Sequence, residues 1–106
     1  MNIKLKHAQE VIKLLKEEEK LKTFTSHKFI GTYIKLHESE YLDLLVEEKN
    51  NPKNTEGIFK PVHRKIGKYL SINQKKLCIS YIGDTTDMNI HHLETPSAEW
   101  RFESSK

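Results

Sequence analysis

From Lys60 to Leu70 the sequence reads KPVHRKIGKYL, and this segment predicts a helix. Pro61 suits the first turn of a helix, where a backbone N–H has no helical partner in any case. Apolar residues recur at the three- and four-residue steps that place them on one side of a helix. These residues are Val62, Ile66, Tyr69 and Leu70. The opposite side carries Arg64, Lys65 and Lys68, so the segment predicts an amphipathic helix with a basic outer face.

The predicted helix lies in a window, Gly57 to Gly83, that contains no acidic residue. The six basic residues of this window are Lys60, Arg64, Lys65, Lys68, Lys75 and Lys76. The whole chain has 18 Lys or Arg and 15 Asp or Glu residues, so the rest holds 12 basic and 15 acidic residues, a net charge of −3. Surface helices usually mix both signs of charge. The segregation predicts a negatively charged partner, of which nucleic acid is the commonest.

The period of the apolar residues changes after this helix. From Leu77 to Ile82 the chain is rich in β-forming residues and predicts a strand. Gly83 to Asp87 predicts a turn, and Met88 to Leu93 a returning strand. Ala98 to Phe102 predicts a short third strand or a packed tail, with Trp100 as a buried anchor.

Three further helices are predicted upstream. The first ends near Leu21, and its apolar stripe comprises Leu5, Ala8, Val11, Ile12, Leu14 and Leu15. The second begins at an N-cap, Thr25 or Ser26, and runs to about His37. The third begins at a Ser39 cap and ends near Glu48; its apolar side comprises Tyr41, Leu42, Leu44, Leu45 and Val46. Residues 49–57 contain turn-forming residues and no apolar side chain, so they predict a solvated loop.

Three short helices, a fourth helix entered through a loop and then a β-hairpin resemble the winged helix-turn-helix fold, an α+β architecture, with an additional helix at the front. The resemblance covers roughly Thr25 to Leu93. It implies that the helix before the hairpin, Lys60 to Leu70, lies in the major groove. It also implies that the turn from Gly83 to Asn89 is the wing.

Two features depart from the usual winged-helix pattern. The loop before the fourth helix has nine residues, Lys49 to Gly57, where a turn of a few residues is usual. The expected wing carries Asp84 and Asp87, and phosphate would repel both. Either contact with a groove would then depend on the helix alone, or the hairpin would point away from the duplex.

The sequence predicts one domain, residues 1–106, that binds double-stranded DNA and has no enzymatic activity, as a regulator or an accessory protein of a mobile element. The six basic residues of the window would contact the DNA, and Lys75 and Lys76 among them would contact flanking phosphates. The alternative is a protein-interaction module of the same fold whose basic face binds an acidic protein. A homodimer through the first helix is a further hypothesis, because its apolar stripe is wide.

The sequence predicts no metal site and no cofactor. His27 and His37 are ten residues apart, His63 stands alone, and His91 and His92 are adjacent, whereas structural zinc sites need paired ligands at short intervals. His27 and His63 are expected to be polar surface or capping groups. The single cysteine, Cys78, is expected to be a buried, inert thiol in a strand. No Gly-rich phosphate loop is present, so a catalytic site is not predicted.

Length and composition also narrow the class of protein. A chain of 106 residues has room for one domain without a large enclosed active site. No apolar stretch approaches the roughly 20 residues that cross a bilayer, and the N-terminus does not resemble a secretory signal. A single Cys cannot form an internal disulfide, so the expected location is the cytoplasm, away from membranes.

Overall fold

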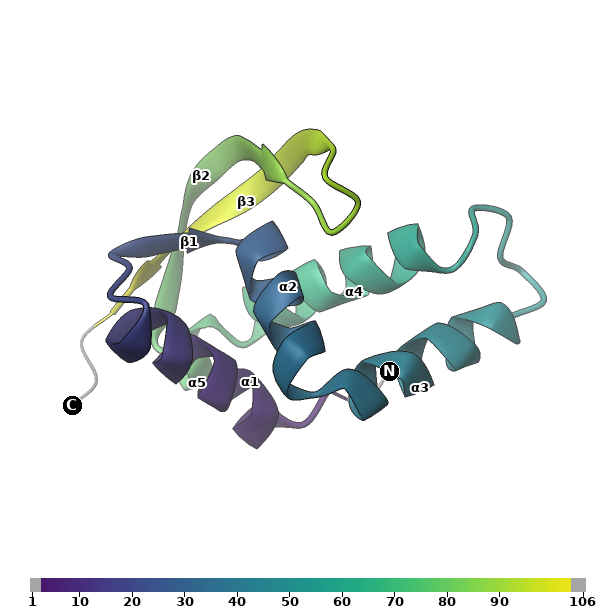
Figure 1. The fold of residues 1–106 in the computed structure, drawn as a ribbon, viewed down its shortest axis with the longest axis horizontal. Coiled ribbons are helices and arrows are strands. Elements are labelled where there is room, and N and C mark those ends of the chain that lie inside the picture. The colour runs from purple at the N-terminus through teal and green to yellow at the C-terminus, as the bar shows by residue number, and fades with distance from the viewer. Residues whose placement is uncertain (1–2, 104–106) are drawn as a thin grey trace.

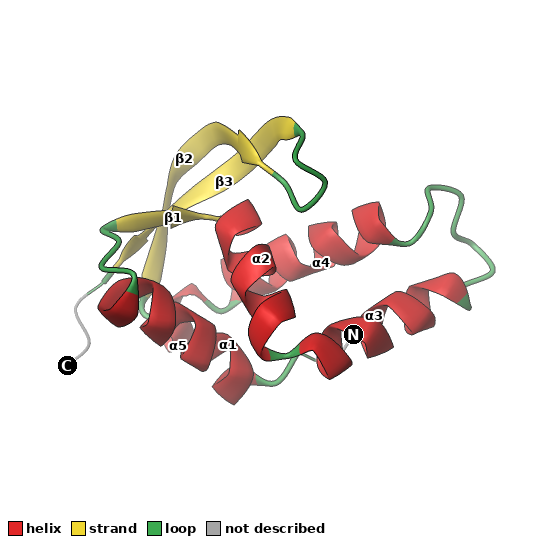
Figure 2. Ribbon diagram, viewed as in Figure 1, coloured by secondary structure: helices red, strands yellow, loops and turns green. Residues whose placement is uncertain are grey.

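The computed structural model describes residues 3–103 and has an α+β architecture, in which helices cover one side of a three-stranded antiparallel sheet (Figures 1 and 2). Its elements, in chain order, are α1 (Leu5–Lys13), a π-helical turn η1 (Leu14–Glu18), β1 (Thr23–Thr25), α2 (Ser26–Leu36), α3 (Glu38–Lys49), α4 (Phe59–Ile72), α5 (Gln74–Leu77), β2 (Ile79–Met88) and β3 (Glu94–Phe102). Among the described residues, no helix is long and apolar enough to cross a membrane.

Strand β3 is the central strand of the sheet, which has the order β1-β3-β2. Trp100 pairs with Phe24 of β1 on one side and with Tyr81 of β2 on the other. Strand β1 is not predicted by the sequence, because a run of three residues is too short to establish a periodic pattern. The predicted two-stranded hairpin is therefore incomplete.

The predicted turn at Gly83 to Asp87 is wrong, because strand β2 continues through it to Met88. The residues from Gly83 to Met88 all pair with β3. Gly83 instead forms a β-bulge: the register shifts between Tyr81 and Gly83, and the φ angle of Gly83 is 140°. The chain reverses after Met88, where the Asn89 N–H donates to the Leu93 carbonyl at 2.9 Å. The predicted returning strand, Met88 to Leu93, is thus mostly this turn, and β3 is the strand that returns.

Several predicted helix ends also differ. The first helix changes to a π-helical turn at Leu14 and ends at Glu18 rather than near Leu21. Helix α3 begins at Glu38, so Ser39 is not its cap. The Thr25 cap is confirmed, since its side chain accepts a hydrogen bond from the Lys28 N–H at 3.1 Å.

The predicted strand beginning at Leu77 starts two residues later, at Ile79. Leu77 ends the short helix α5, and Cys78 then adopts a left-handed conformation with a φ angle of 55°. The thiol is partly exposed, so the expectation of a fully buried cysteine inside a strand is wrong.

The core lies where α1, α2 and α4 meet the sheet. Val62, Ile66 and Leu70 of α4 are buried, as predicted. Trp100 is 2% exposed, which confirms its role as an anchor, and its indole N–H donates to Ser26 Oγ at 2.9 Å. From α1 and η1 the core receives Ala8, Val11, Ile12 and Leu15. The apolar stripe that a homodimer through the first helix would need is therefore used within the chain.

Candidate nucleic-acid interface

The exposed face of α4 carries three cations at successive four-residue steps, Lys60, Arg64 and Lys68, which we call the cationic stripe. All three side chains are exposed. Residues four apart on an α-helix lie about 6 Å apart along its axis, so the stripe follows the length of α4. The three cations lie on the side of α4 opposite the buried Val62 and Ile66, so their surface position follows from the helical pattern of the sequence.

A carboxylate from the preceding loop lies against the first two members of the stripe. Arg64 Nη2 is 2.9 Å from Oε1 and 3.0 Å from Oε2 of Glu56, and Lys60 Nζ is 3.9 Å from Oε1. The hydrogen bond from Arg64 lowers the pKa of Glu56 below its ordinary value, and the same bond raises that of Arg64. The window from Gly57 to Gly83 contains no acidic residue in the sequence, but the fold places the carboxylate of Glu56 against two of its basic residues.

Asn54 fixes the loop that carries Glu56. Its Nδ2 donates to the Gly57 carbonyl at 2.6 Å, and its Oδ1 accepts a hydrogen bond from the Glu56 N–H at 2.8 Å. Gly57 has a φ angle of 85°, a left-handed conformation that glycine adopts without a side-chain clash. The turn formers that predict a solvated loop thus also hold its carboxylate in place.

Lys65 faces a different carboxylate, on α3. Its Nζ lies 3.0 Å from Glu48 Oε1, and the Glu48 side chain is only 3% exposed. Asn51 Nδ2 donates to the other oxygen of Glu48 at 3.2 Å. Because a buried carboxylate needs a counter-charge, Lys65 contributes to the fold, which makes it a poor candidate for a DNA contact.

Lys75 and Lys76 lie on α5, beyond the far end of α4. Helix α4 has 14 residues and is therefore about 21 Å long, so these lysines do not converge with Lys60. Lys76 lines a cavity of about 340 Å³ together with Lys13 and Lys16 of the first helical segment. Within residues 3–103, neither Lys68 nor the two α5 lysines form an ion pair.

A cleft of about 400 Å³ opens between α2, α4 and the sheet. Arg64 lines this cleft and also a smaller one of about 200 Å³ beside Glu56. Other lining residues are His27, His63, Ser71, Tyr81 and Trp100. The arginine of the stripe is therefore accessible from two sides of α4.

His63 lies at the inner side of this cleft and is not the surface or capping group that the sequence predicts. Its Nε2 is 2.6 Å from the hydroxyl oxygen of Tyr41. Burial, together with the charge of nearby His91 and His27, lowers the pKa of His63 to about 4, and burial raises the pKa of Tyr41 to about 12. Tyr41 therefore donates to a neutral His63 at neutral pH. His27 is likewise engaged, with its Nε2 2.7 Å from Thr95 Oγ1.

The turn that joins β2 and β3 folds over the start of α4 (Figure 1). The ring of His91 in this turn meets the ring of Phe59 edge to face, with centroids 5.0 Å apart. Asp84 and Asp87, which the sequence predicts at the tip, lie within β2. Asp84 accepts a hydrogen bond from the Tyr81 hydroxyl, and Asp87 one from Thr25.

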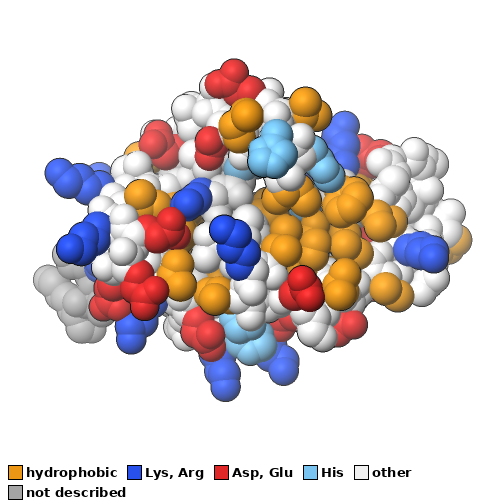
Figure 3. Space-filling view, in the orientation of Figure 1, with side chains coloured by type: hydrophobic (Ala, Val, Ile, Leu, Met, Phe, Trp, Pro, Cys, Tyr) orange, Lys and Arg blue, Asp and Glu red, His pale blue; other side chains and the backbone are white. Residues whose placement is uncertain are grey.

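Figure 3 shows a hydrophobic area on the face of the molecule where Figure 1 draws α3 and α4. Leu42 and Val46 of α3 are 51% and 54% exposed, so their predicted burial is wrong. Phe59 at the start of α4 is also exposed. The cationic stripe is thus not the only surface of this molecule suited to a partner.

A second group of polar side chains was missed by the sequence analysis. His7, Glu10 and His37 each offer one ligand atom, and these atoms lie within 4.8 Å of one another. The spacing of the histidines along the chain gives no signal for this group, because α1 and α2 bring it together.

Comparison with protein-family models, with curated proteins and with solved structures gives no match. A function for this chain therefore has to be inferred from its own residues. The features available for that inference are the cationic stripe with its adjoining cleft, the exposed apolar side chains of α3 and α4, and the group formed by His7, Glu10 and His37.

Proposed function

We propose that the protein binds double-stranded DNA through the cationic stripe of α4. The observation that carries the proposal is the alignment of Lys60, Arg64 and Lys68 on one exposed helix face, in a part of the sequence with no acidic residue. Lysine and arginine that neutralise phosphates release condensed counterions, and this release drives much of DNA binding. Lys75 and Lys76 would extend the contact past the end of α4, whereas Lys65 would stay with Glu48.

The proposal includes a winged helix-turn-helix mode of binding, in which the helix before an antiparallel strand pair enters the major groove. In this chain α4 and the short α5 precede the paired strands β2 and β3. Support also comes from the turn between these strands, residues 89–93, which contains two histidines and no carboxylate. Asp84 and Asp87 lie in β2 and not in this turn. A regulatory or mobile-element role and a cytoplasmic location remain parts of this proposal.

The contact between Glu56 and Arg64 does not prevent such binding on energetic grounds. An ion pair between two exposed side chains is weak, because water screens it. Phosphate offers Arg64 the same geometry of oxygen atoms as the carboxylate does. A DNA phosphate can therefore replace Glu56 at a cost smaller than the gain from several phosphate contacts.

The test is the affinity for a mixed-sequence 20-base-pair duplex, measured by fluorescence anisotropy at several salt concentrations. Three to five phosphate contacts predict a slope of log K against log salt concentration of about −3 to −4.5. The absence of binding at low salt, or a slope shallower than about −1, would reject the proposal.

The second candidate is a protein-interaction module that binds an acidic, amphipathic partner. The observation that favours it is the exposure of three apolar side chains, Leu42, Val46 and Phe59, the last of which directly precedes the first cation of the stripe. Poly-glutamate of the same total charge as the duplex serves as the probe. Binding of poly-glutamate as tight as that of DNA at equal salt would favour this candidate over the first.

A further inference from the structure

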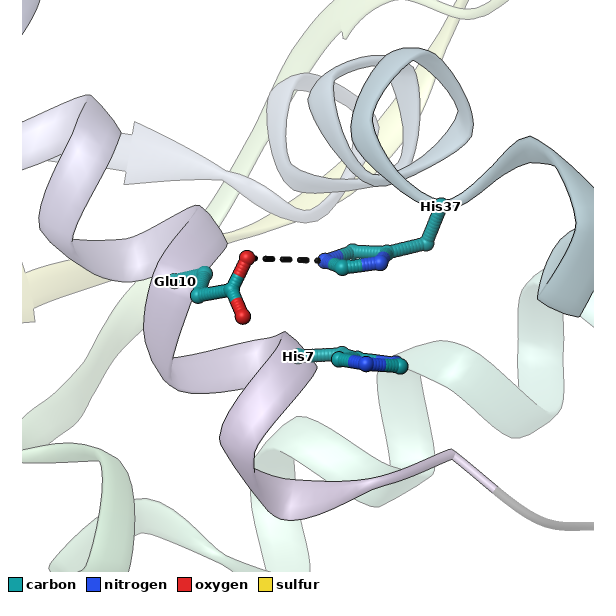
Figure 4. Close-up of side chains that lie close together, drawn as sticks. All are labelled: His7, Glu10 and His37. Atoms are coloured by element: carbon teal, nitrogen blue, oxygen red, sulfur yellow. Dashed lines mark ion pairs between the residues drawn. The ribbon is translucent and has the colours of Figure 1, made fainter.

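Helix α1 and the end of α2 bring three side chains of metal-binding types close together (Figure 4). None of the three belongs to the cationic stripe. His7 and Glu10 are three residues apart on α1 and therefore share one face of that helix. His37 follows the last residue of α2. One potential ligand atom from each of the three lies within 4.8 Å of the others.

A second carboxylate orients His7. Glu40 Oε1 is 3.1 Å from His7 Nδ1, and Glu40 Oε2 accepts a hydrogen bond from the Tyr33 hydroxyl at 2.6 Å. The Glu40 carboxylate accepts a hydrogen bond from the Tyr33 hydroxyl and lies within hydrogen-bond distance of His7 Nδ1, an arrangement that places the His7 proton on Nδ1 and leaves Nε2 as the potential ligand atom. Histidine ligands of metals commonly have such a carboxylate partner.

The ring of His37 has a buried nitrogen that no hydrogen bond satisfies. Its Nε2 has no hydrogen-bond partner among the described residues, and it lies 3.4 Å from Glu10 Oε2. An unsatisfied buried polar atom costs about 1–3 kcal/mol. Two ligands bound at about 2.0–2.1 Å with tetrahedral angles are about 3.4 Å apart. The distance of 3.4 Å between His37 Nε2 and Glu10 Oε2 therefore shows that the two side chains are close enough to share one ion once a ring has turned.

We propose that His7, Glu10 and His37 bind one divalent transition-metal ion, with Zn²⁺ as the best match to two imidazoles and a carboxylate. Three protein ligands leave a fourth position for water on the side of Glu10, whose side chain is 52% exposed. The bound ion would join α1 to the end of α2. This role does not depend on DNA binding, because none of the three residues belongs to the cationic stripe.

Metal binding requires one of the two rings to turn. The rings of His7 and His37 are stacked, with centroids 3.9 Å apart and planes inclined by 15°, whereas an imidazole binds a metal in its own plane. His7 is held by Glu40, while His37 faces only the largely exposed Glu10 at its Nε2. Rotation of the His37 ring about its Cβ–Cγ bond is therefore the adjustment that we expect.

The test uses Co²⁺ as a spectroscopic probe and Zn²⁺ in calorimetry on the full chain. We expect one ion per chain, the visible bands of a four-coordinate cobalt site, and a rise in Tm with Zn²⁺. His7→Ala and His37→Ala should each weaken Zn²⁺ binding at least tenfold, and Glu40→Gln should weaken it tenfold to a hundredfold through the orientation of His7. The matched control is the double variant His91→Ala/His92→Ala, which removes two exposed histidines elsewhere.

Circular dichroism of each variant without metal checks that it is folded, and His37→Gln replaces His37→Ala if the latter is not. The proposal is overturned if Zn²⁺ binds the His7 and His37 variants as tightly as it binds the parent. It is also overturned if binding is lost only in the His91/His92 variant, or if 100 µM Zn²⁺, roughly 100 times a micromolar Kd, leaves the Tm unchanged.

Discussion

Arg64 Nη2 lies 2.9 Å from one carboxylate oxygen of Glu56 and 3.0 Å from the other. One nitrogen of the guanidinium group therefore contacts both oxygens of an anionic group, and a phosphate is an anion that can take the place of this carboxylate. The Glu56 carboxylate also lies 3.9 Å from Lys60 Nζ. One carboxylate of the chain is therefore paired with two of the three cations of the stripe. Any DNA phosphate at this position has to compete with Glu56.

Glu56→Gln should strengthen DNA binding. The substitution removes the competing charge and leaves an amide of the same shape. Because an exposed ion pair is weak, the gain in affinity should be no more than about fivefold. Fluorescence anisotropy with the mixed-sequence duplex measures it. Glu18→Gln is the control, because it changes the net charge equally at an exposed position of η1. Equal gains in the two variants would mean that Glu56 has no special relation to the DNA site.

Arg64→Glu combined with Lys68→Glu should abolish DNA binding, with a loss of at least a hundredfold. Two phosphate contacts disappear and two carboxylates are added, so the salt slope of any residual binding should fall in magnitude by about 1.8. Stability should change by no more than about 1 kcal/mol, because both side chains are exposed. The control Lys6→Glu/Lys22→Glu has the same change in net charge. An equal loss of affinity in the control would show that α4 is not the contact.

The regular parts of the fold could be predicted because local patterns determine them. Helix α4 is recognisable from Pro61 and the spacing of Val62, Ile66 and Leu70. Strand β1 could not be predicted, because its three residues become a strand only by pairing with β3. The turn was misplaced because Gly83 to Asp87 has turn composition, yet its glycine forms a bulge and its threonines suit a strand.

The stripe itself could be predicted, but its electrostatic surroundings could not. The absence of acids from Gly57 to Gly83 is a property of the sequence, whereas Glu48 and Glu56 enter from outside this window through the fold. The group of His7, Glu10 and His37 shows the same limitation, since two helices assemble it from distant positions. The burial of Glu48 could not be predicted from the sequence, because charged residues on the last turn of a helix are usually solvated.

Lys65→Ala should destabilise the protein by about 1–2 kcal/mol, because it removes the counter-charge of the buried Glu48, although Lys65 itself is partly exposed. Lys68→Ala, one turn further along the same helix, should change stability by less than about 0.5 kcal/mol. Urea unfolding measures both values. For DNA affinity the order should be reversed, with the larger loss in Lys68→Ala. A larger loss of affinity in Lys65→Ala would assign Lys65 to the DNA contact.

His63 should make the fold less stable at acidic pH. Its pKa is about 4 in the folded chain and about 6.5 in an unfolded chain, so below pH 6.5 the unfolded state binds the proton first. Stability is complete above pH 6.5 and falls as the pH decreases toward 4. Because the ring is only partly buried, the loss is on the order of 1 kcal/mol.

The His63 effect is measured as the difference between urea unfolding at pH 7 and at pH 4.5 for the parent and for His63→Gln. The variant should lose less stability on acidification than the parent does. His92→Asn is the control, since His92 is exposed and asparagine tolerates its left-handed φ angle of 61°. Identical pH profiles for the parent and His63→Gln would contradict the low pKa of His63.

The pair of Trp100 and Ser26 should stabilise the packing of the sheet on α2. Trp100→Ala should cost about 3–5 kcal/mol, because it removes the largest side chain of the central strand from the core. Ser26→Ala leaves the indole N–H without its acceptor and should cost about 1–2 kcal/mol, whereas Trp100→Phe combined with Ser26→Ala should cost little more than Trp100→Phe alone. The double-mutant cycle compares the parent, Ser26→Ala, Trp100→Phe and the double variant, and thermal or urea unfolding measures the stability of each. Strictly additive losses would show that the 2.9 Å hydrogen bond contributes nothing to stability and that Trp100 acts through burial alone.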